Sequence, residues 1–116
     1  MQSAITWFEL FVTDMPRAVK FYEAALGTTL EQKDFMGEPH ALLGGGALVK
    51  REGRAPSEAG VVVYLNCAGK LDEVLRRVPA AGGAVVAPKS SIGPQGFVAM
   101  IRDSEGNQVG LHAAPQ

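Results

Sequence analysis

The chain has 116 residues, of which 47% are hydrophobic and 20% are charged, a composition typical of one soluble globular domain. Eleven Lys and Arg residues against twelve Asp and Glu residues give a formal net charge of -1, and no basic block is present that would bind a nucleic-acid backbone. No apolar stretch reaches the roughly 18 residues that a membrane helix needs, and the N-terminus has no signal-peptide pattern. We therefore expect a cytoplasmic protein without nucleic-acid or membrane partners.

The first half of the chain predicts one helix and four strands. Asp14 and Gly27 are suited to cap the two ends of a helix, and the apolar residues between them recur at intervals of three and four. Three consecutive glycines from Gly44 fit a tight turn between two strands. The predicted elements are a strand over 5–12, a helix over 15–26, a strand over 28–35, and hairpin strands over 39–43 and 47–51.

The second half repeats this order. A shift of 55 positions places Leu26 and Gly27 on Ala81 and Gly82, where a second helix is predicted to end. The predicted elements are a strand over 61–66, a helix over 71–81, and strands over 84–87, 96–102 and 108–113.

The order βαβββ-βαβββ predicts an α+β fold in which tandem modules form a curled eight-stranded mixed sheet with a central cup. We expect a single domain over 1–116, with module one at 4–53, a linker at 54–59 and module two at 60–114. A ferredoxin-like βαββαβ sandwich is the competing architecture. It has two fewer strands and leaves the hairpin predicted over 42–51 without a place.

Two segments carry a resemblance to a known superfamily. The segment FELFVTDMPRAVKFYEAALG combines a strand, an Asp, and Phe-Tyr followed four residues later by Leu-Gly, and the chain closes with IRDSEGNQVGLHA. They resemble the opening and the ending of the vicinal oxygen chelate superfamily, which includes glyoxalase I, bleomycin-resistance proteins and extradiol dioxygenases. Together with the tandem βαβββ order, the resemblance covers nearly the whole chain.

The resemblance also indicates where a metal would be held. In the metalloenzymes of this superfamily, His, Gln or Glu side chains on the first and fourth strands of each module hold one divalent ion. These positions fall here on Trp7, on Val62 or its neighbour Val61, on the strand over 47–51, and on Gly110. None of them carries the expected ligand. We therefore expect no metal and no cofactor, with a divalent ion possible only in a relocated site.

Because side chains alternate along a strand, residues two positions from these metal positions lie on the same face, so several polar groups could face the cup. Glu9 and His112 are candidate catalytic groups, as acid and base or as ligands of a relocated metal, although a structural role is an open alternative for both. A Glu within the apolar segment WFELF needs a partner or solvent. The candidate ligand-binding residues are Tyr64 and Asn66 as hydrogen-bonding groups and Trp7, Phe11, Phe97 and Met100 as apolar lining.

Three other features have structural interpretations. His40 is expected on an exposed or edge strand as a solvated imidazole, and Cys67 is expected to be a small buried hydrophobic residue. Residues 89–96 form either a flap over the pocket mouth or a plain connection.

Three functions fit these observations. The preferred one is a metal-free protein that binds a small organic ligand in the cup, as the bleomycin-resistance branch does by sequestration. The second is a glyoxalase-related enzyme, a lyase, isomerase or dioxygenase-like protein, that uses Glu9 and His112. The third is an interaction protein whose cup is filled by Trp7. The resemblance also implies a homodimer.

Overall fold

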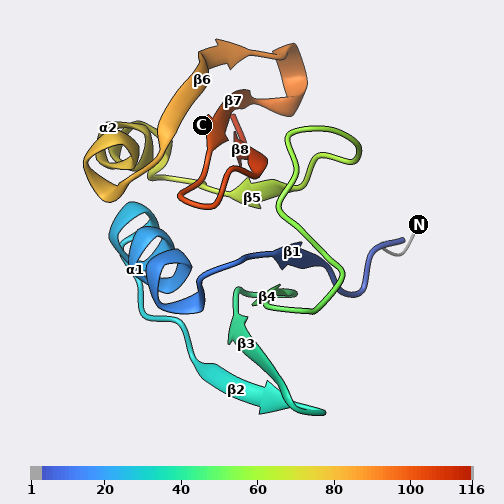
Figure 1. Ribbon diagram of the computed structural model, residues 1–116. Helices are drawn as coiled ribbons and strands as arrows, with labels where there is room; N and C mark the ends of the chain where they lie inside the picture. Colours follow the sequence, from blue (N-terminus) through green and yellow to red (C-terminus); the bar gives the residue numbers. More distant parts are fainter. Residues whose placement is uncertain (1–3, 116) are drawn as a thin grey trace.

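The structure is a computed structural model that describes residues 4–115 and shows two βαβββ units in tandem (Figure 1). The first unit consists of β1 (Glu9–Phe11), α1 (Met15–Leu26), β2 (Gln32–Phe35), β3 (Glu38–Leu42) and β4 (Ala47–Val49). The second consists of β5 (Tyr64–Asn66), α2 (Leu71–Ala81), β6 (Ala84–Ser91), the short 3-10 helix η1 (Gly93–Gln95), β7 (Phe97–Arg102) and β8 (Gln108–Ala113). The predicted fold class is confirmed.

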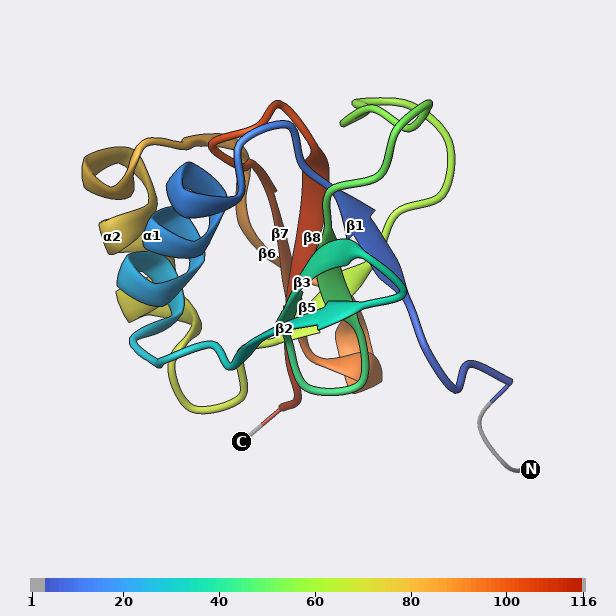
Figure 2. The same ribbon diagram turned by 60° about the horizontal axis from the view of Figure 1, so that its bottom comes forward.

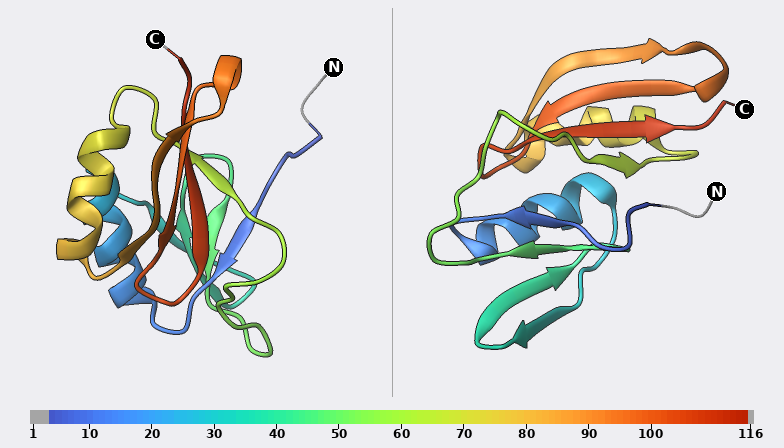
Figure 3. Two further views of the ribbon diagram at one scale, coloured as in Figure 1. Left: turned by 90° about the horizontal axis from the view of Figure 1, so that it is seen from above. Right: turned by 90° about the vertical axis from the view of Figure 1, so that its right-hand side faces the viewer.

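Each unit contains one four-stranded mixed sheet with the same strand order. The orders are β1-β4-β3-β2 and β5-β8-β7-β6, and the pairs β1-β4 and β5-β8 are parallel. The two sheets lie side by side with β1 and β5 toward each other (Figure 3). Over residues 4–115 no ladder joins them, so the expected eight-stranded sheet consists of two open sheets.

The internal repeat is visible in the backbone. Strand β1 begins at Glu9 and β5 begins at Tyr64, 55 positions later, and both strands have three residues. The helices end at Leu26 and Ala81, again 55 positions apart. The shift of 55 positions that the sequence predicts is therefore a repeat of structure.

The two helices lie next to each other on one side of the molecule and cover one face of the sheets (Figure 2). Leu10 and Val12 are buried in the core, as are Val19 and Tyr22 of α1, because alternation directs the even-numbered residues of the first strand toward the helices. Cys67 is also fully buried, as predicted. No helix within residues 4–115 has the length and apolar character required to cross a bilayer.

Several strand ends differ from the prediction. Strands β1, β2 and β5 are shorter than expected, since composition indicates which residues favour extended backbone but not where the partner strand ends. Strand β6 is longer and continues to Ser91 with two shifts in its pairing with β7. Most of the segment 89–96 therefore belongs to β6 and η1.

The turn between β7 and β8 connects the two units. The buried Tyr22 hydroxyl donates to Asp103 over 2.7 Å, and the Asn107 amide donates to the Phe11 carbonyl over 2.8 Å. The Glu105 carboxylate accepts from the backbone N–H of Thr13 and of Asp14, both over 3.0 Å. This turn thus fixes the position of β1 and the start of α1 relative to module two.

Candidate functional site

A pocket of about 640 Å³ lies between β1 and the segment that leads from the linker into β5. Trp7 lines this pocket and does not fill it, so the interpretation of a cup collapsed by Trp7 is wrong. The lining residues are Ile5, Trp7, Phe8, Glu9, Leu10, Phe11, Ala55, Ser57, Ala59, Val61, Val62, Val63, Tyr64, Asn107 and Gln108.

Exposed apolar side chains concentrate at this pocket. Trp7 is 47% exposed and Tyr64 is 50% exposed, although large aromatic side chains are usually well buried. Ile5, Val61 and Val62 are exposed beside them. Contiguous exposure of apolar side chains is typical of interaction surfaces and ligand-binding grooves.

Glu9 supplies the charge of the pocket. Its Oε1 accepts a hydrogen bond of 2.8 Å from Arg51 Nη1, and the Trp7 side chain also hydrogen-bonds it. The bond from Arg51 lowers the pKa of Glu9 more than burial raises it. Glu9 is therefore an ionised carboxylate at neutral pH, held in one orientation yet still accessible at the pocket.

Arg51 joins Glu9 to a second carboxylate. Its Nε donates to Glu38 over 2.9 Å, so one guanidinium is shared by two carboxylates, which we name the Glu9–Arg51–Glu38 cluster. The bonds to Glu38 and Glu9 raise the pKa of Arg51. The guanidinium also lies 5.5 Å from the centre of the Phe11 ring.

His40 lies within reach of this cluster. Its Nδ1 is 2.9 Å from the Glu38 carbonyl oxygen, which can only accept, so Nδ1 carries the proton and Nε2 is left 4.0 Å from Glu9 Oε2. The imidazole is only 6% exposed and meets the Phe35 ring edge to face. The expectation of a solvated His40 is wrong, because β3 lies inside the sheet between β2 and β4.

His112 and Asn66 have partners of their own in module two. His112 Nε2 lies 2.8 Å from the Gln95 carbonyl, and the Asn66 side chain accepts from the backbone N–H of Ala68 over 2.9 Å. Neither residue lines the pocket that contains Glu9. The structure therefore does not bring His112 and Glu9 together as an acid–base pair.

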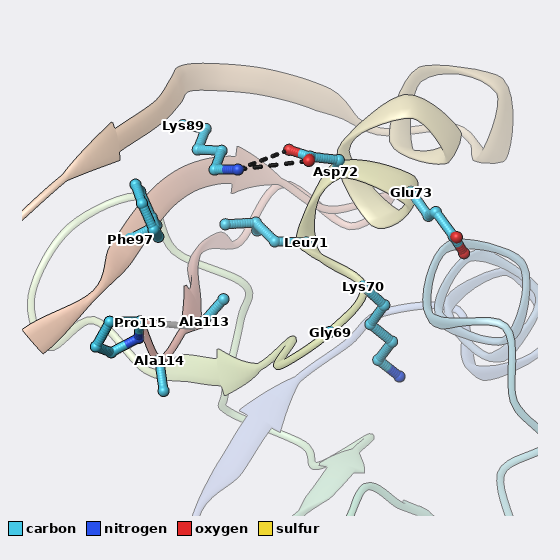
Figure 4. A pocket seen from close by; sticks show the side chains of 10 residues that line it. All are labelled: Gly69, Lys70, Leu71, Asp72, Glu73, Lys89, Phe97, Ala113, Ala114 and Pro115. Carbon is cyan, nitrogen blue, oxygen red and sulfur yellow. Dashed lines mark hydrogen bonds and ion pairs between the residues drawn. The ribbon is translucent and has the colours of Figure 1, made fainter.

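Phe97 and Met100 lie on opposite faces of β7. Phe97 shares the face of the buried Ala99 and Ile101 and packs against the core, while Met100 pairs with Gly110 of β8. Phe97 lines a different pocket, of about 510 Å³, beside the start of α2, where Lys89 lies 4.8 Å from its ring centre (Figure 4). Phe97 therefore lies on the face of β7 that packs toward α2 and does not line the pocket beside β1, and Met100 lies on the other face because residues three apart in a strand face opposite ways.

The side chains at the metal positions of the superfamily do not fit a divalent ion. Trp7 and Val62 have no lone pair to give a metal, and the Tyr64 ring covers Gly110 so closely that a Cβ there would collide with it. Within residues 4–115, no three or more His, Cys, Asp or Glu side chains are grouped as a metal would require. The cation that Glu9 does meet is the Arg51 guanidinium.

Arg51, Glu38 and His40 are site residues that sequence reasoning missed. Strand alternation from Ala47 through Val49 places Arg51 on the same face, and Ala47 pairs with Glu9. His40 pairs with Val49 in the neighbouring strand. The sequence therefore indicates that Arg51 shares a face with Ala47. Placing Arg51 beside Glu9 also requires knowing that β1 pairs with β4.

Replacing Arg51 tests how the charge on Glu9 is maintained. In Arg51→Met, the pKa of Glu9 is expected to rise above its value in the parent protein, because the hydrogen bond that lowers it most is lost while burial remains. A pH titration of the carboxyl carbon signal of Glu9 by NMR measures the change. Lys50→Met removes the same charge one residue earlier and should leave this pKa nearly unchanged; an equal rise there would contradict a specific role of Arg51.

Solved structures with this fold cover almost the whole chain. A glyoxalase/bleomycin resistance protein from Albidiferax ferrireducens aligns with a TM-score of 0.73 and 20% identity over 97% of this chain and 100% of that one. The fosfomycin resistance protein FosX from Listeria monocytogenes aligns with a TM-score of 0.68 and 18% identity over 98% and 95%. A glyoxalase-related enzyme from Fulvimarina pelagi gives 0.67 and 16% over 97% and 88%. These likenesses establish the fold.

Comparison by sequence identifies the family. A search of curated proteins finds no match. The family model described as Glyoxalase/Bleomycin resistance protein/Dioxygenase superfamily matches residues 4–111. The chain therefore belongs to the glyoxalase/bleomycin resistance protein/dioxygenase superfamily.

Proposed function

We propose that this protein binds a small organic molecule in the pocket beside β1 and that it does so without a metal ion or cofactor. The observation that carries the proposal is the pocket of about 640 Å³, within the range of roughly 300–1,000 Å³ that is usual for small-molecule sites. Its walls are mainly apolar, with the exposed rings of Trp7 and Tyr64 and one carboxylate, Glu9. Apolar walls with a few directed polar groups are typical of ligand sites.

The superfamily is compatible with this proposal. Solved structures of this fold include proteins named for bleomycin or fosfomycin resistance as well as enzymes. Binding alone requires neither a metal nor a reaction, which suits a site whose metal positions hold Trp7 and Gly110. Homodimer formation and a cytoplasmic location stay predictions.

A glyoxalase-related enzyme is the second candidate function. Glu9 and His112 are not paired, and the imidazole that lies near Glu9 is His40, whose Nε2 is 4.0 Å from Glu9 Oε2. His40 is buried and is not among the residues that line the pocket. For this reason we favour binding over catalysis.

Metal addition separates metal-free binding from an enzyme with a relocated metal site. The melting temperature of protein stripped with a chelator is expected to stay within about 1 °C on addition of Ni²⁺, Zn²⁺, Mn²⁺ or Fe²⁺, because only a ligand that binds the folded state raises it. Differential scanning fluorimetry makes the measurement. A rise of several degrees that is lost in Glu9→Ala but kept in Glu31→Ala would overturn the metal-free proposal.

A further inference from the structure

We infer that the ligand of this pocket is an organic cation, an amine or quaternary ammonium group attached to an apolar body. The inference rests on the proposed function, since it names the chemical class that the pocket beside β1 takes. It is carried by the charge of the lining, by the surroundings of Glu9, and by the two exposed aromatic rings beside it.

Glu9 is the one charged side chain among the fifteen residues that line the pocket. Its neighbours there, Ser57, Asn107 and Gln108, are neutral polar residues. The Glu9 side chain is 25% exposed, so it is not sealed off by its own ion pair. A negatively charged ligand would meet this carboxylate in a partly desolvated place, which is unfavourable, whereas a cation would be attracted to it.

The ion pair with Arg51 does not cancel this charge. The Arg51 guanidinium forms ion pairs with two carboxylates at once, at 2.8 Å from Glu9 and 2.9 Å from Glu38. The Glu9–Arg51–Glu38 cluster therefore has one negative charge in excess. The Arg54 guanidinium lies over the Phe11 ring, 5.6 Å from its centre, and Arg54 is not among the residues that line the pocket.

Trp7 and Tyr64 supply surfaces that suit a cation. Both rings line the pocket and are about half exposed, and the Trp7 side chain hydrogen-bonds Glu9, which keeps ring and carboxylate together. Trp and Tyr faces attract organic cations, most strongly where water is partly excluded. Phe11 already faces two guanidinium groups, and the Phe8 ring packs against the core and over Gly46, so Trp7 and Tyr64 are the exposed rings of the lining that remain for a ligand.

The pocket beside α2 lacks this combination. It contains Lys70, Asp72, Glu73 and Lys89, charges of both signs, and the Lys89 ammonium is held by Asp72 at 3.2 Å (Figure 4). Such a lining favours neither a cation nor an anion. The contrast makes the pocket beside β1 the place to test for charge selection.

Two probes of the same shape test the inference. Phenyltrimethylammonium and tert-butylbenzene differ in charge, and phenylacetate serves as an anionic probe. Trp7 is the single tryptophan of the chain, so tryptophan fluorescence reports binding at this pocket directly. We expect phenyltrimethylammonium to bind about tenfold more tightly than tert-butylbenzene and to weaken as NaCl is raised from 20 to about 500 mM.

Charge removal at Glu9 completes the test. In Glu9→Gln the affinity for phenyltrimethylammonium is expected to fall about tenfold while that for tert-butylbenzene is unchanged, and Glu31→Gln should behave as the parent protein. Equal or tighter binding of tert-butylbenzene or phenylacetate would overturn the cationic class but leave a binding pocket, and with it the proposed function. Binding of none of the probes would contradict both the class and the pocket.

Discussion

Asp103→Ala is expected to lower the free energy of unfolding by about 3–5 kcal/mol, the largest loss among the single substitutions considered. Asp103 is 3% exposed and accepts from the Tyr22 hydroxyl and from the backbone N–H groups of Glu105 and Asn107. Its removal leaves the buried Tyr22 hydroxyl without this acceptor and releases the turn that connects the modules. Urea unfolding followed by circular dichroism measures the loss.

A second variant tests whether the loss comes from the bond to Tyr22. Tyr22→Phe alone should cost about 1.5–3 kcal/mol, but in the Asp103→Ala background it should be neutral or stabilising, because the hydroxyl no longer has Asp103 to bind. Asp34→Ala, on the exposed strand β2, is the control and should stay within about 0.5 kcal/mol of the parent. Simple additivity of the two substitutions would show that this hydrogen bond is unimportant.

Glu105→Gln should destabilise the protein by about 2 kcal/mol at pH 7. Burial raises the pKa of Glu105, but the bonds from Arg17 and from the N–H groups of Asp14 and Thr13 outweigh it and lower this pKa to about 2. The full lowering of the Glu105 pKa would correspond to a somewhat larger loss of unfolding free energy than the roughly 2 kcal/mol expected here. Arg17 is 53% exposed, so solvent screens part of its attraction.

The pH dependence of this effect has a definite sign. Because the pKa of Glu105 is lower in the folded state than the usual 4.5, its stabilisation is complete above about pH 5 and is lost as the pH falls toward 2. The difference in unfolding free energy between the parent and Glu105→Gln should therefore shrink from pH 7 to pH 3. Glu58→Gln, which removes an exposed ion pair with Arg102, should change stability little at any pH. A difference for Glu105→Gln that does not vary with pH would refute this account.

The helices were predictable because their ends depend on local chemistry. Asp14 accepts from the Arg17 N–H over 3.0 Å, and Gly27 has a φ of 70°, so the first helix begins and ends where capping rules place it. Glu9 was predictable as a pocket residue from its spacing to Trp7. Both inferences use residues fewer than about fifteen positions apart.

The contacts of the site were not predictable in the same way. The ion pair of Glu9 with Arg51 and the burial of His40 depend on which strands pair and in which register, and these partners lie about 30 to 40 positions from Glu9. The role of Glu105 depends on contact between the two halves of the chain. Phe97 and Met100, in contrast, could have been assigned to opposite faces from their spacing alone.

The repeat of β1 in β5 gives the two sides of the molecule the same backbone but different chemistry. Glu9 corresponds to Tyr64 and Phe11 to Asn66 after the shift of 55 positions, so an acid stands opposite a phenol where symmetry would place identical groups. A ligand bound between the two halves, as we propose, would have a carboxylate on one side and a phenol on the other, so its two end-for-end orientations would differ in energy. The repeated backbone would then bind an asymmetric molecule in one preferred direction.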